Sequence, residues 1–367
     1  MTEQLKVELG KRSYPVSVGQ GLLPAICDAR DAALESGKKV VFLLDEGFKN
    51  AYPMACDELV GGNLFHILPS GEKTKSISCL EQIWNFLGAS KLDRSGVLFA
   101  VGGGVVGDLV GFAAATFLRG ISFYQVPTTL LAMVDSSVGG KTGINLQAGK
   151  NLVGSFHQPD AVWADTSFLE HLPSREFSAG MAEVIKYGML GDDELYRKLS
   201  RSASPLSFNC LELESVIKQC CQIKARIVAT DEKETSGDGK GRALLNLGHT
   251  FAHAIEAVAG YGVYLHGEAV AIGLCCALRL SQKMNLCAGE SLQELEDLLR
   301  SYSLPVELKE PLAEDLLLDA MASDKKVSHG KLRFVIMNQV GDAIQTDQVK
   351  LQDVRKVLGE VGASCGS

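Results

Sequence analysis

The sequence lacks an uninterrupted hydrophobic run long enough to cross a membrane. Its most apolar segment, residues 97–118, is broken by glycines and by Asp108, whereas a membrane-spanning helix needs about 20 consecutive apolar residues. The first residues carry charges throughout and contain no hydrophobic signal core. Internal repeats and low-complexity tracts are also lacking. We therefore expect a globular, cytoplasmic protein with no membrane partner.

Positive charge is the minority charge, because 36 Lys and Arg stand against 44 Asp and Glu, giving a net charge of -8. This balance argues against nucleic acid or an acidic membrane surface as a partner. A site for an anionic ligand must therefore gather scarce cations in one place. The C-x-x-C motif is absent too, and the adjacent pairs Cys220–Cys221 and Cys275–Cys276 lie in apolar segments. Free thiols of this kind favour a reducing compartment.

The length of 367 residues suits two domains. A strand pair is expected in residues 6–19, and short apolar runs then alternate with helix-like segments up to about residue 172, which predicts a mainly parallel, Rossmann-like α/β domain. Later segments read as largely buried helices, with one strand-like run, "KLRFVIMNQVG", near the end. We predict a nucleotide-binding α/β domain (1–172), a mainly α-helical domain for metal and substrate (173–367), and an active site in the cleft between them.

A glycine-rich turn follows one of the expected strands. Gly102 to Gly107 satisfies G-x-G-x-x-G and opens a helix, a context in which backbone N–H groups hold a pyrophosphate. The acidic residue usually found about 20 positions later, which binds the ribose, is missing. Asp45, at the end of another strand, is a candidate for that role, and "PSGEKTKS" adds Glu72 and Lys75. A tight turn that only permits close packing is the alternative.

A polar stretch, "VPTTLLAMVDSSVGGKTGINLQAGKN", occupies residues 126–151. It fails the P-loop pattern because Asp135 stands where the first glycine is required. Its density of glycine, serine and polar side chains favours a ligand cradle over a solvated loop. The candidates are Thr128, Thr129, Asp135, Lys141, Lys150 and Asn151.

Three of the seven histidines, His249, His253 and His266, fall in one short stretch. The first two are four residues apart and share a helix face, but "HTFAH" lacks the glutamate of a zincin protease. A catalytic zinc typically has three protein ligands and one open position. Glu183, in the apolar segment "SAGMAEVIKYG", is a candidate third ligand, and Lys186 lies one turn further along. The alternative is that the histidines only satisfy hydrogen bonds in the core, and which two would bind metal is left open.

Taken together, these segments resemble the 3-dehydroquinate synthase family, in the sugar-phosphate cyclase branch related to the glycerol-dehydrogenase-like, iron-type alcohol dehydrogenases. The resemblance covers nearly the whole chain. It rests on "PSGEKTKS", "GGGVVGD", "TFLRG", "VPTTLLAMVDSSVGGKTGIN", "GKNLVGSFHQP", "GMAEVIKYG", "LLNLGHTFAHAIE", "LHGEAV" and "DKKVSHGKLRFV".

The resemblance implies a set of site residues. It implies zinc, or cobalt as a substitute, on Glu183, His249 and His266, with His253 left to contact substrate. It implies catalytic roles for Asp135, Glu183, Lys186 and His253. The implied NAD-binding residues are Asp45, Ser70, Gly71, Glu72, Lys73, Thr74, Lys75, Gly104, Val105, Val106, Gly107, Asp108, Thr128, Thr129, Lys141, Lys150, Phe168, Leu169, Glu170 and His171. The implied substrate contacts are Arg119, Lys141, Asn151, Lys224, Arg242, Asn246 and Lys326, the last preferred over Lys325.

The implied reaction converts 3-deoxy-D-arabino-heptulosonate 7-phosphate to 3-dehydroquinate and phosphate, a step of the shikimate pathway. NAD would oxidise one hydroxyl transiently, and phosphate elimination, reduction, ring opening and aldol closure would follow. Arg242 and Lys224 suit the substrate carboxylate, and Lys326 and Arg119 suit its phosphate. Arg119 would reach the partner's site in a homodimer, and Lys186 would take a hydroxyl proton if its pKa is lowered. The alternatives are another sugar-phosphate cyclase, a metal-dependent polyol dehydrogenase, and an inactive scaffold.

Overall fold

The computed structural model describes residues 3–236, 241–288, 290, 292–323 and 332–364. The chain forms two compact units, each of which is discontinuous in sequence. The first contains residues 1–173 and 207–229, and the second contains residues 174–206 and 230–367. The predicted assignment of NAD to residues 1–172, and of metal and substrate to residues 173–367, stays a prediction. Residues 207–229, which follow the first segment of the second unit, belong to the first unit.

The first unit is built on a seven-stranded sheet in which every neighbouring pair is parallel except β1 and β2. This arrangement confirms the predicted strand pair and the predicted mainly parallel sheet. The strand order is β1-β2-β9-β6-β5-β3-β4. The bounds are β1 (Glu3–Val7), β2 (Tyr14–Gly19), β3 (Val40–Asp45), β4 (Leu64–Leu68), β5 (Val97–Gly102), β6 (Ser122–Pro127) and β9 (Val162–Asp165).

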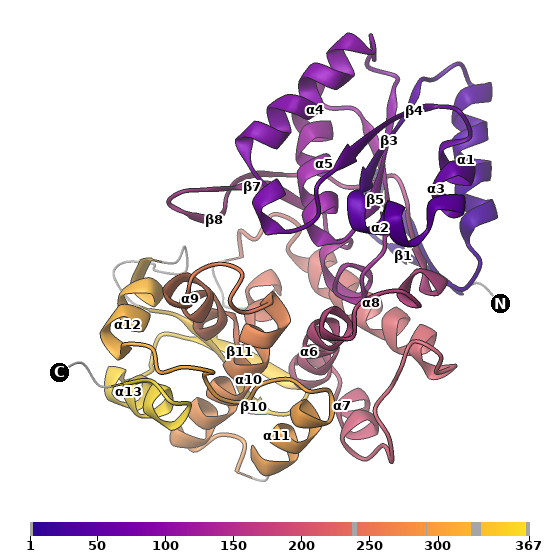
Figure 1. Cartoon of the computed structure of the whole chain (residues 1–367). Helices are drawn as coiled ribbons and strands as arrows, with labels where there is room; N and C mark the ends of the chain where they lie inside the picture. The colour runs from indigo at the N-terminus through magenta and orange to yellow at the C-terminus, as the bar shows by residue number, and fades with distance from the viewer. Residues whose placement is uncertain (1–2, 237–240, 289, 291, 324–331, 365–367) are drawn as a thin grey trace. The chain divides into compact units, whose positions relative to one another are not determined.

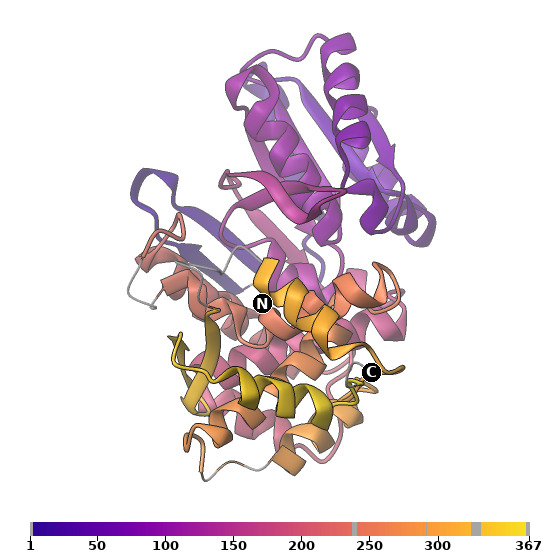
Figure 2. The ribbon, with the colours of Figure 1, turned by 90° about the vertical axis from the view of Figure 1, so that its left-hand side faces the viewer.

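Helices cover both faces of this sheet, because its central strands are apolar on both sides. In β3, Val41 and Leu43 face one hydrophobic cluster, while Phe42 and Leu44 face the other. Figure 1 shows α4 and α5 on one side of the strands and α1 and α3 on the other, and Figure 2 views the unit from the α4–α5 side. The helices of this unit are α1 (Leu23–Glu35), α2 (Glu46–Ala51), α3 (Pro53–Val60), α4 (Ile77–Ala89), α5 (Gly104–Thr116) and α8 (Glu212–Thr230).

The polar stretch at residues 126–151 is more regular than a loop. It contains a π-helical turn, η4 (Ala132–Ser136), followed by a hairpin of β7 (Lys141–Leu146) and β8 (Gly149–Phe156). The hairpin packs on α5, where Gly111 leaves room for Thr142, since a Cβ at residue 111 would lie 2.5 Å from a Thr142 methyl. Short 3-10 turns complete the unit: η1 (Gly10–Arg12), η2 (Glu72–Thr74), η3 (Phe117–Arg119) and η5 (Thr166–Leu169).

The second unit is mainly helical, as predicted. Its helices are α6 (Ser174–Gly191), α7 (Asp193–Ser200), η6 (Gly241–Asn246), α9 (His249–Ala259), α10 (His266–Lys283), α11 (Leu292–Ser301), α12 (Glu314–Ser323) and α13 (Leu351–Glu360). The predicted late strand is β10 (Phe334–Gln339), and it pairs with β11 (Asp342–Thr346), which the sequence pattern did not reveal.

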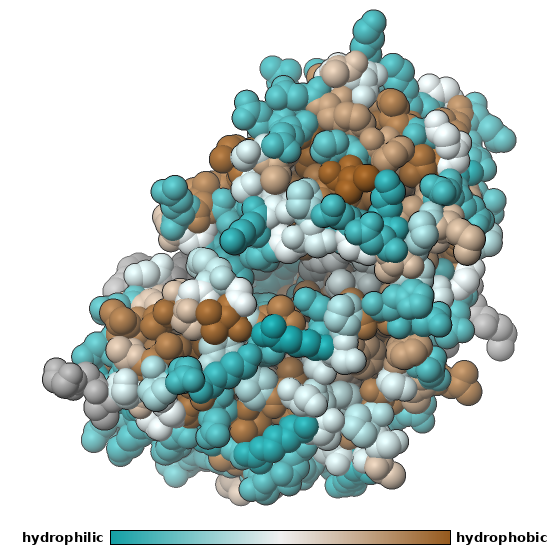
Figure 3. Space-filling model, in the orientation of Figure 1, coloured by the Kyte–Doolittle hydropathy of each residue, from teal (hydrophilic) through white to brown (hydrophobic). Residues whose placement is uncertain are grey.

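Within the described residues, no helix is both long enough and apolar enough to span a bilayer. In the space-filling view, hydrophilic and hydrophobic side chains are intermixed over the visible face of each unit (Figure 3).

Candidate active site

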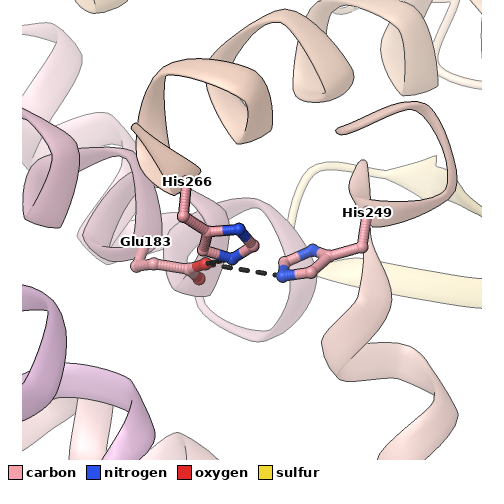
Figure 4. Close-up of side chains that lie close together, drawn as sticks. All are labelled: Glu183, His249 and His266. Atoms are coloured by element: carbon pink, nitrogen blue, oxygen red, sulfur yellow. Dashed lines mark ion pairs between the residues drawn. The ribbon is translucent and has the colours of Figure 1, made fainter. Parts of the chain in front are cut away.

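Three side chains of the second unit form a compact cluster of metal-ligand type. Glu183 comes from the middle of α6, and His249 and His266 are the first residues of α9 and α10. One ligand atom of each residue lies within 4.8 Å of the others. Figure 4 shows the carboxylate and the two imidazoles directed toward one another. The choice that the sequence left open therefore falls on His249 and His266.

Glycines on α10 allow the backbones of α6, α9 and α10 to lie close enough for this cluster to form. A Cβ on Gly267, next to His266, would lie 1.9 Å from the carbonyl oxygen of Ala179, one turn before Glu183 on α6. A Cβ on Gly273 would likewise lie 2.2 Å from the carbonyl oxygen of Gly248, next to His249. Glycine at these positions allows α10 to contact the backbone of α6 and the start of α9 directly.

The Nε2 atoms of both histidines point at the same carboxylate oxygen. Each lies 3.5 Å from Oε1 of Glu183, while the other carboxylate oxygen pairs with the ammonium of Lys186. Glu183 and Lys186 are buried, at 0% and 1% exposed. Oε1 accepts no hydrogen bond within the described residues. A buried oxygen without a hydrogen-bond donor, facing two imidazole nitrogens, is suited to binding a cation.

The remaining nitrogen of each ring has its own acceptor. Nδ1 of His249 lies 3.1 Å from the Leu247 carbonyl oxygen, and Nδ1 of His266 lies 3.1 Å from a Glu256 carboxylate oxygen. A neutral histidine that donates from Nδ1 keeps its lone pair on Nε2, the nitrogen that faces the cluster. Glu256 was not predicted from the sequence. Its signal was a glutamate inside the apolar run "AHAIEAVA", the same kind of signal that indicated Glu183.

The start of α10 is fixed by a second carboxylate that the sequence analysis missed. Glu268 accepts from the backbone N–H of Leu265 at 3.1 Å and pairs with Arg175 and Lys309 at 2.7 and 2.9 Å. Burial favours the neutral acid, but Arg175 and Lys309 outweigh it and lower the pKa of Glu268 to about 2. The ion pairs and the capping contact hold the helix end that carries His266.

In the metal-free protein, the pKa values of His249 and His266 are shifted in opposite directions. Burial and the charge of Lys186 lower the pKa of His249 to about 4. Burial also opposes charge on His266, but the carboxylates of Glu256 and Glu183 outweigh it and raise the pKa of His266 to about 10. Burial raises the pKa of Glu183, yet Lys186 and both histidines lower it well below its usual range. The carboxylate is therefore ionised at neutral pH, as a metal ligand must be.

These residues fit a zinc-type ion. Two imidazole nitrogens and one carboxylate oxygen make a three-ligand set that leaves one coordination position open, the usual arrangement for a catalytic zinc. His253 lies outside the set, with its ring 5.5 Å from that of His249 and 6.1 Å from that of His266, measured between centroids. This placement leaves His253 beside the cluster, where its predicted role toward substrate stays a prediction.

The glycine-rich turn of the first unit is closely surrounded by polar side chains. Added Cβ atoms on Gly103 and Gly104 would lie 3.1 Å from a Thr129 methyl and 2.9 Å from the Ser136 hydroxyl, so the turn requires small residues. The turn leads into α5, whose first residues are the predicted cofactor contacts Gly104, Val105, Val106, Gly107 and Asp108. Ser136 was not predicted, and it adds a hydroxyl beside this helix N-terminus.

Asp108 belongs to a polar cluster with Lys75, which is buried, and Asn151, which is exposed. The Lys75 ammonium contacts both the Asp108 carboxylate and the Asn151 side-chain oxygen. Burial raises the pKa of Asp108, and Lys75 acts against that shift. The cluster joins the "PSGEKTKS" loop, α5 and the β7–β8 hairpin.

Asp45 is hydrogen-bonded to the loop that follows β4. The Asp45 carboxylate caps α2 by accepting from the Phe48 N–H at 3.0 Å, and it accepts from the Ser70 hydroxyl at 2.9 Å. Further along the loop, Glu72 accepts from the Asn145 amide at 2.7 Å and lies 3.8 Å from the Lys150 ammonium. The predicted cofactor contacts Asp45, Ser70 and Glu72 are thus held by hydrogen bonds within the first unit.

The other predicted cofactor residues of the first unit are also placed by identifiable contacts. Lys73 lies in η2, and Thr74 next to it donates to the Pro69 carbonyl at 2.7 Å, closing the loop that contains Gly71. Thr128 donates its backbone N–H to Gly102 at 3.0 Å. The segment Phe168, Leu169, Glu170 and His171 packs beside Tyr52, whose hydroxyl accepts the His171 N–H at 3.0 Å. Lys141 begins β7 and is exposed.

The predicted substrate residues fall in both units. In the first, Lys224 of α8 donates to the Asp135 backbone carbonyl at 2.7 Å and to its carboxylate at 2.9 Å, while Arg119 is exposed with a positive φ of 71°. In the second, Arg242 is fully buried and donates to the Glu232 carbonyl at 2.6 Å. Asn246 lies in the same turn, η6. Lys325 and Lys326 lie outside the described residues.

Comparison with known proteins tests the resemblance. The family described as 3-dehydroquinate synthase N-terminal matches residues 65–179, and that described as 3-dehydroquinate synthase C-terminal matches residues 180–327. A 3-dehydroquinate synthase from Opitutus terrae is 52% identical over 364 residues, covering 99% of this chain and 100% of the relative. Another, from Rhodopirellula baltica, is 49% identical and covers 96% of each chain. The chain belongs to the 3-dehydroquinate synthase family.

Solved structures with the same fold include other sugar-phosphate cyclases. A 2-epi-5-epi-valiolone synthase from Streptomyces hygroscopicus, solved with NAD+ and Zn2+, has a TM-score of 0.84 at 26% identity and covers 96% of this chain and 98% of that one. A 2-deoxy-scyllo-inosose synthase, solved with carbaglucose-6-phosphate, NAD+ and Co2+, has a TM-score of 0.83 at 27% identity, covering 98% and 100%. A probable glycerol dehydrogenase from Sinorhizobium meliloti, at 17% identity and a TM-score of 0.63, covers 94% and 95% and shares the fold. The predicted family and fold class are confirmed.

Proposed function

We propose that this protein is a 3-dehydroquinate synthase, a lyase that closes a carbocycle while eliminating phosphate from 3-deoxy-D-arabino-heptulosonate 7-phosphate. The observation that carries the proposal is full-length similarity to curated 3-dehydroquinate synthases, at 41 to 52% identity. That similarity is combined with a buried Glu183–His249–His266 cluster of metal-ligand type. The product belongs to the shikimate pathway of aromatic amino acid biosynthesis, and the protein would act in the cytoplasm.

The cofactors we propose are NAD and zinc, with cobalt as a substitute. The cyclase neighbours were solved with NAD+ together with Zn2+ or Co2+, and the residues of this chain suit both groups. Zinc on Glu183, His249 and His266 would supply a Lewis acid for neighbouring substrate hydroxyls. NAD would be held by the glycine-rich turn, with Asp45 toward the ribose, and by the polar side chains around Lys75.

Lys186 is the residue we propose to move a proton at the oxidised hydroxyl. Its side chain is 1% exposed and its ammonium pairs with Glu183, so the amine lies beside the proposed metal site in a poorly solvated place. A positioned amine there can accept the hydroxyl proton in its neutral form and return it after the reduction step. Asp135, His253 and Asn151 would orient the substrate around that hydroxyl.

The residues that we propose to bind the two anionic groups support the substrate class. Lys224 and Arg242 would bind the carboxylate, and Arg119 from a second subunit with Lys326 would bind the phosphate. A homodimer follows from the role given to Arg119. The cyclase neighbours are 26 and 27% identical to this chain, well below the curated 3-dehydroquinate synthases, which favours the carboxylated substrate.

The proposal is tested by following inorganic phosphate in the presence of trace NAD. Phosphate release far in excess of the NAD supplied, without accumulation of NADH, is expected from the heptulosonate phosphate. Glucose 6-phosphate, which lacks the carboxylate, serves as the matched substrate and should yield none. Stoichiometric NADH without phosphate would instead indicate a polyol dehydrogenase, and turnover of glucose 6-phosphate alone would indicate another cyclase.

A further inference from the structure

Glu256 is a buried carboxylate for which the proposed reaction provides no role. It lies on α9, seven residues after His249, and is 3% exposed. At this spacing Glu256 returns to the face of α9 that carries His249. Its carboxylate lies 3.1 Å from Nδ1 of His266, a residue of the neighbouring helix α10. One face of α9 therefore supplies a metal-ligand candidate and the hydrogen-bond partner of another.

The two candidate histidines are held in different ways. Nδ1 of His249 faces the carbonyl of Leu247, a backbone group two residues away. Nδ1 of His266 faces a side chain that belongs to a different helix. The side chain of His266 is also the more exposed, at 31% against 10% for His249. Its ring orientation therefore depends more heavily on Glu256 than that of His249 depends on any side chain.

Charge in the cluster gives a second reason for a carboxylate at this position. His249 and His266 each begin a helix, where the unpaired backbone N–H groups carry a partial positive charge. Lys186 adds a full positive charge beside Glu183. A divalent cation placed there would meet one anionic ligand only. Glu256 supplies a second negative charge one hydrogen bond away from the cluster.

We propose that Glu256 is a positioning residue that fixes the ring of His266 so that Nε2 faces the metal. Accepting from Nδ1–H, the carboxylate selects the tautomer with its lone pair on Nε2 and prevents the ring from turning over. It also makes the imidazole a stronger donor to a cation. The proposal rests on the proposed metal site, but it concerns metal binding and not turnover.

The test uses the full chain, stripped of metal, with Glu256→Gln and Glu256→Ala. Zinc affinity is measured by competition with a chromogenic chelator, and the coordination geometry by the visible absorption of the Co2+-loaded protein. We expect zinc to bind about 10-fold more weakly to Glu256→Gln and about 100-fold more weakly to Glu256→Ala, the range known for outer-shell partners. The Co2+ spectrum should change as well, because the His266 ring is no longer held.

A matched control is Glu296→Gln, which alters another buried glutamate of the second unit. Glu296 is 9% exposed and pairs with Arg279 and Arg300, not with the histidines. Its substitution should lower thermal stability while leaving zinc affinity and the Co2+ spectrum unchanged. If Glu256→Ala does not fold, the isosteric Glu256→Gln decides the question.

Two results would overturn the proposal while leaving the metal site intact. Equal zinc affinity in the wild type and both Glu256 variants would show that His266 is oriented without this carboxylate. Tighter zinc binding in Glu256→Gln would show that Glu256 serves mainly as a counter-charge for protonated His266. Absence of zinc binding by the wild type would contradict the proposed metal site itself, so the two failures are distinguishable.

Discussion

Gly267 at the start of α10 lies directly against Ala179 of α6. A Cβ at position 267 would be 1.9 Å from the Ala179 carbonyl oxygen, which no side-chain rotation can relieve. The contact sets the separation between the helix that carries Glu183 and the helix that begins with His266. Backbone packing, and not only the choice of ligand residues, therefore determines whether the three candidate ligands meet.

The first prediction follows from this contact. Gly267→Ala must separate α6 from α10, and such overpacking costs about 1–3 kcal/mol or more. We expect a lower free energy of unfolding and zinc affinity weakened by more than the loss of stability alone explains. Denaturant unfolding and chelator competition measure the two effects. Gly359→Ala in α13 is the control, because its Cβ would meet nothing within 4 Å, and it should be neutral or stabilising by about 0.5–1 kcal/mol.

The second prediction concerns Lys186 and its ion pair with Glu183. Lys186→Met removes the proposed proton carrier, so kcat should fall by about 10²–10⁴-fold. Zinc content should persist, because the carboxylate that shares its charge with Lys186 becomes wholly available to the metal. Steady-state phosphate release and metal analysis test this split. Loss of zinc together with activity would assign Lys186 to metal binding and contradict its role in proton transfer.

The third prediction concerns the polar cluster of Lys75, Asp108 and Asn151. Lys75→Met leaves the partly buried Asp108 carboxylate without its cation, and leaving a charged acceptor without its partner in this way costs about 1–3 kcal/mol. The double variant Lys75→Met/Asp108→Asn removes the stranded charge and should recover a large part of that stability. Urea unfolding of the wild type and of these variants measures the changes in the free energy of unfolding. If the double variant is less stable than Lys75→Met alone, the pairing of Lys75 with Asp108 does not govern this region.

The fourth prediction is a pH dependence of the metal-free protein. The pKa of His266 is raised from 6.5 to about 10, so its contribution to stability is fully present below pH 6.5 and is lost as pH rises through 10. The pKa of His249 is lowered from 6.5 to about 4, so its contribution is present above pH 6.5 and is lost as pH falls through 4. From these two groups, stability should be greatest near pH 6.5.

Zinc provides the control for that pH dependence. A bound metal requires neutral His266, so zinc binding between pH 6.5 and 10 should release a proton, and zinc affinity should increase with pH over this range. Calorimetry in buffers of different ionisation enthalpy detects the released proton. Zinc binding without proton release at neutral pH would show that His266 is not the protonated member of the cluster.

The sequence predicted the sheet well and the finer structure poorly, for physical reasons. Apolar runs such as residues 40–44 and 97–102 are buried, and buried strands of a parallel sheet leave a clear hydrophobic signal. The β7–β8 hairpin has no such signal, because β8 is largely exposed and carries glycines. β11 was missed because its residues are short of apolar character, and its pairing with β10 is a tertiary property.

In the candidate site, too, some residues could be singled out from the sequence and others could not. Glu183 and the three histidines were singled out because ionisable residues in apolar segments are unusual. The choice of His249 and His266 as the predicted ligands came only from the resemblance. Glu256 gave a similar signal but had no partner in the sequence pattern, since its hydrogen bond to His266 depends on how α9 and α10 pack. Ser136 lies in the polar stretch that predicted a ligand cradle, but nothing singled it out there, because its position beside Gly104 follows from the π-helical turn that contains it.

A zinc titration of the metal-free protein, with phosphate release from the heptulosonate phosphate measured at each step, tests most directly whether the Glu183–His249–His266 cluster binds the catalytic metal. We expect no release without metal, a linear rise that ends at one zinc per chain, and no recovery in His266→Ala at the same zinc concentrations. Full activity in the metal-free protein, or recovery of His266→Ala at one zinc per chain, would contradict this role of the cluster.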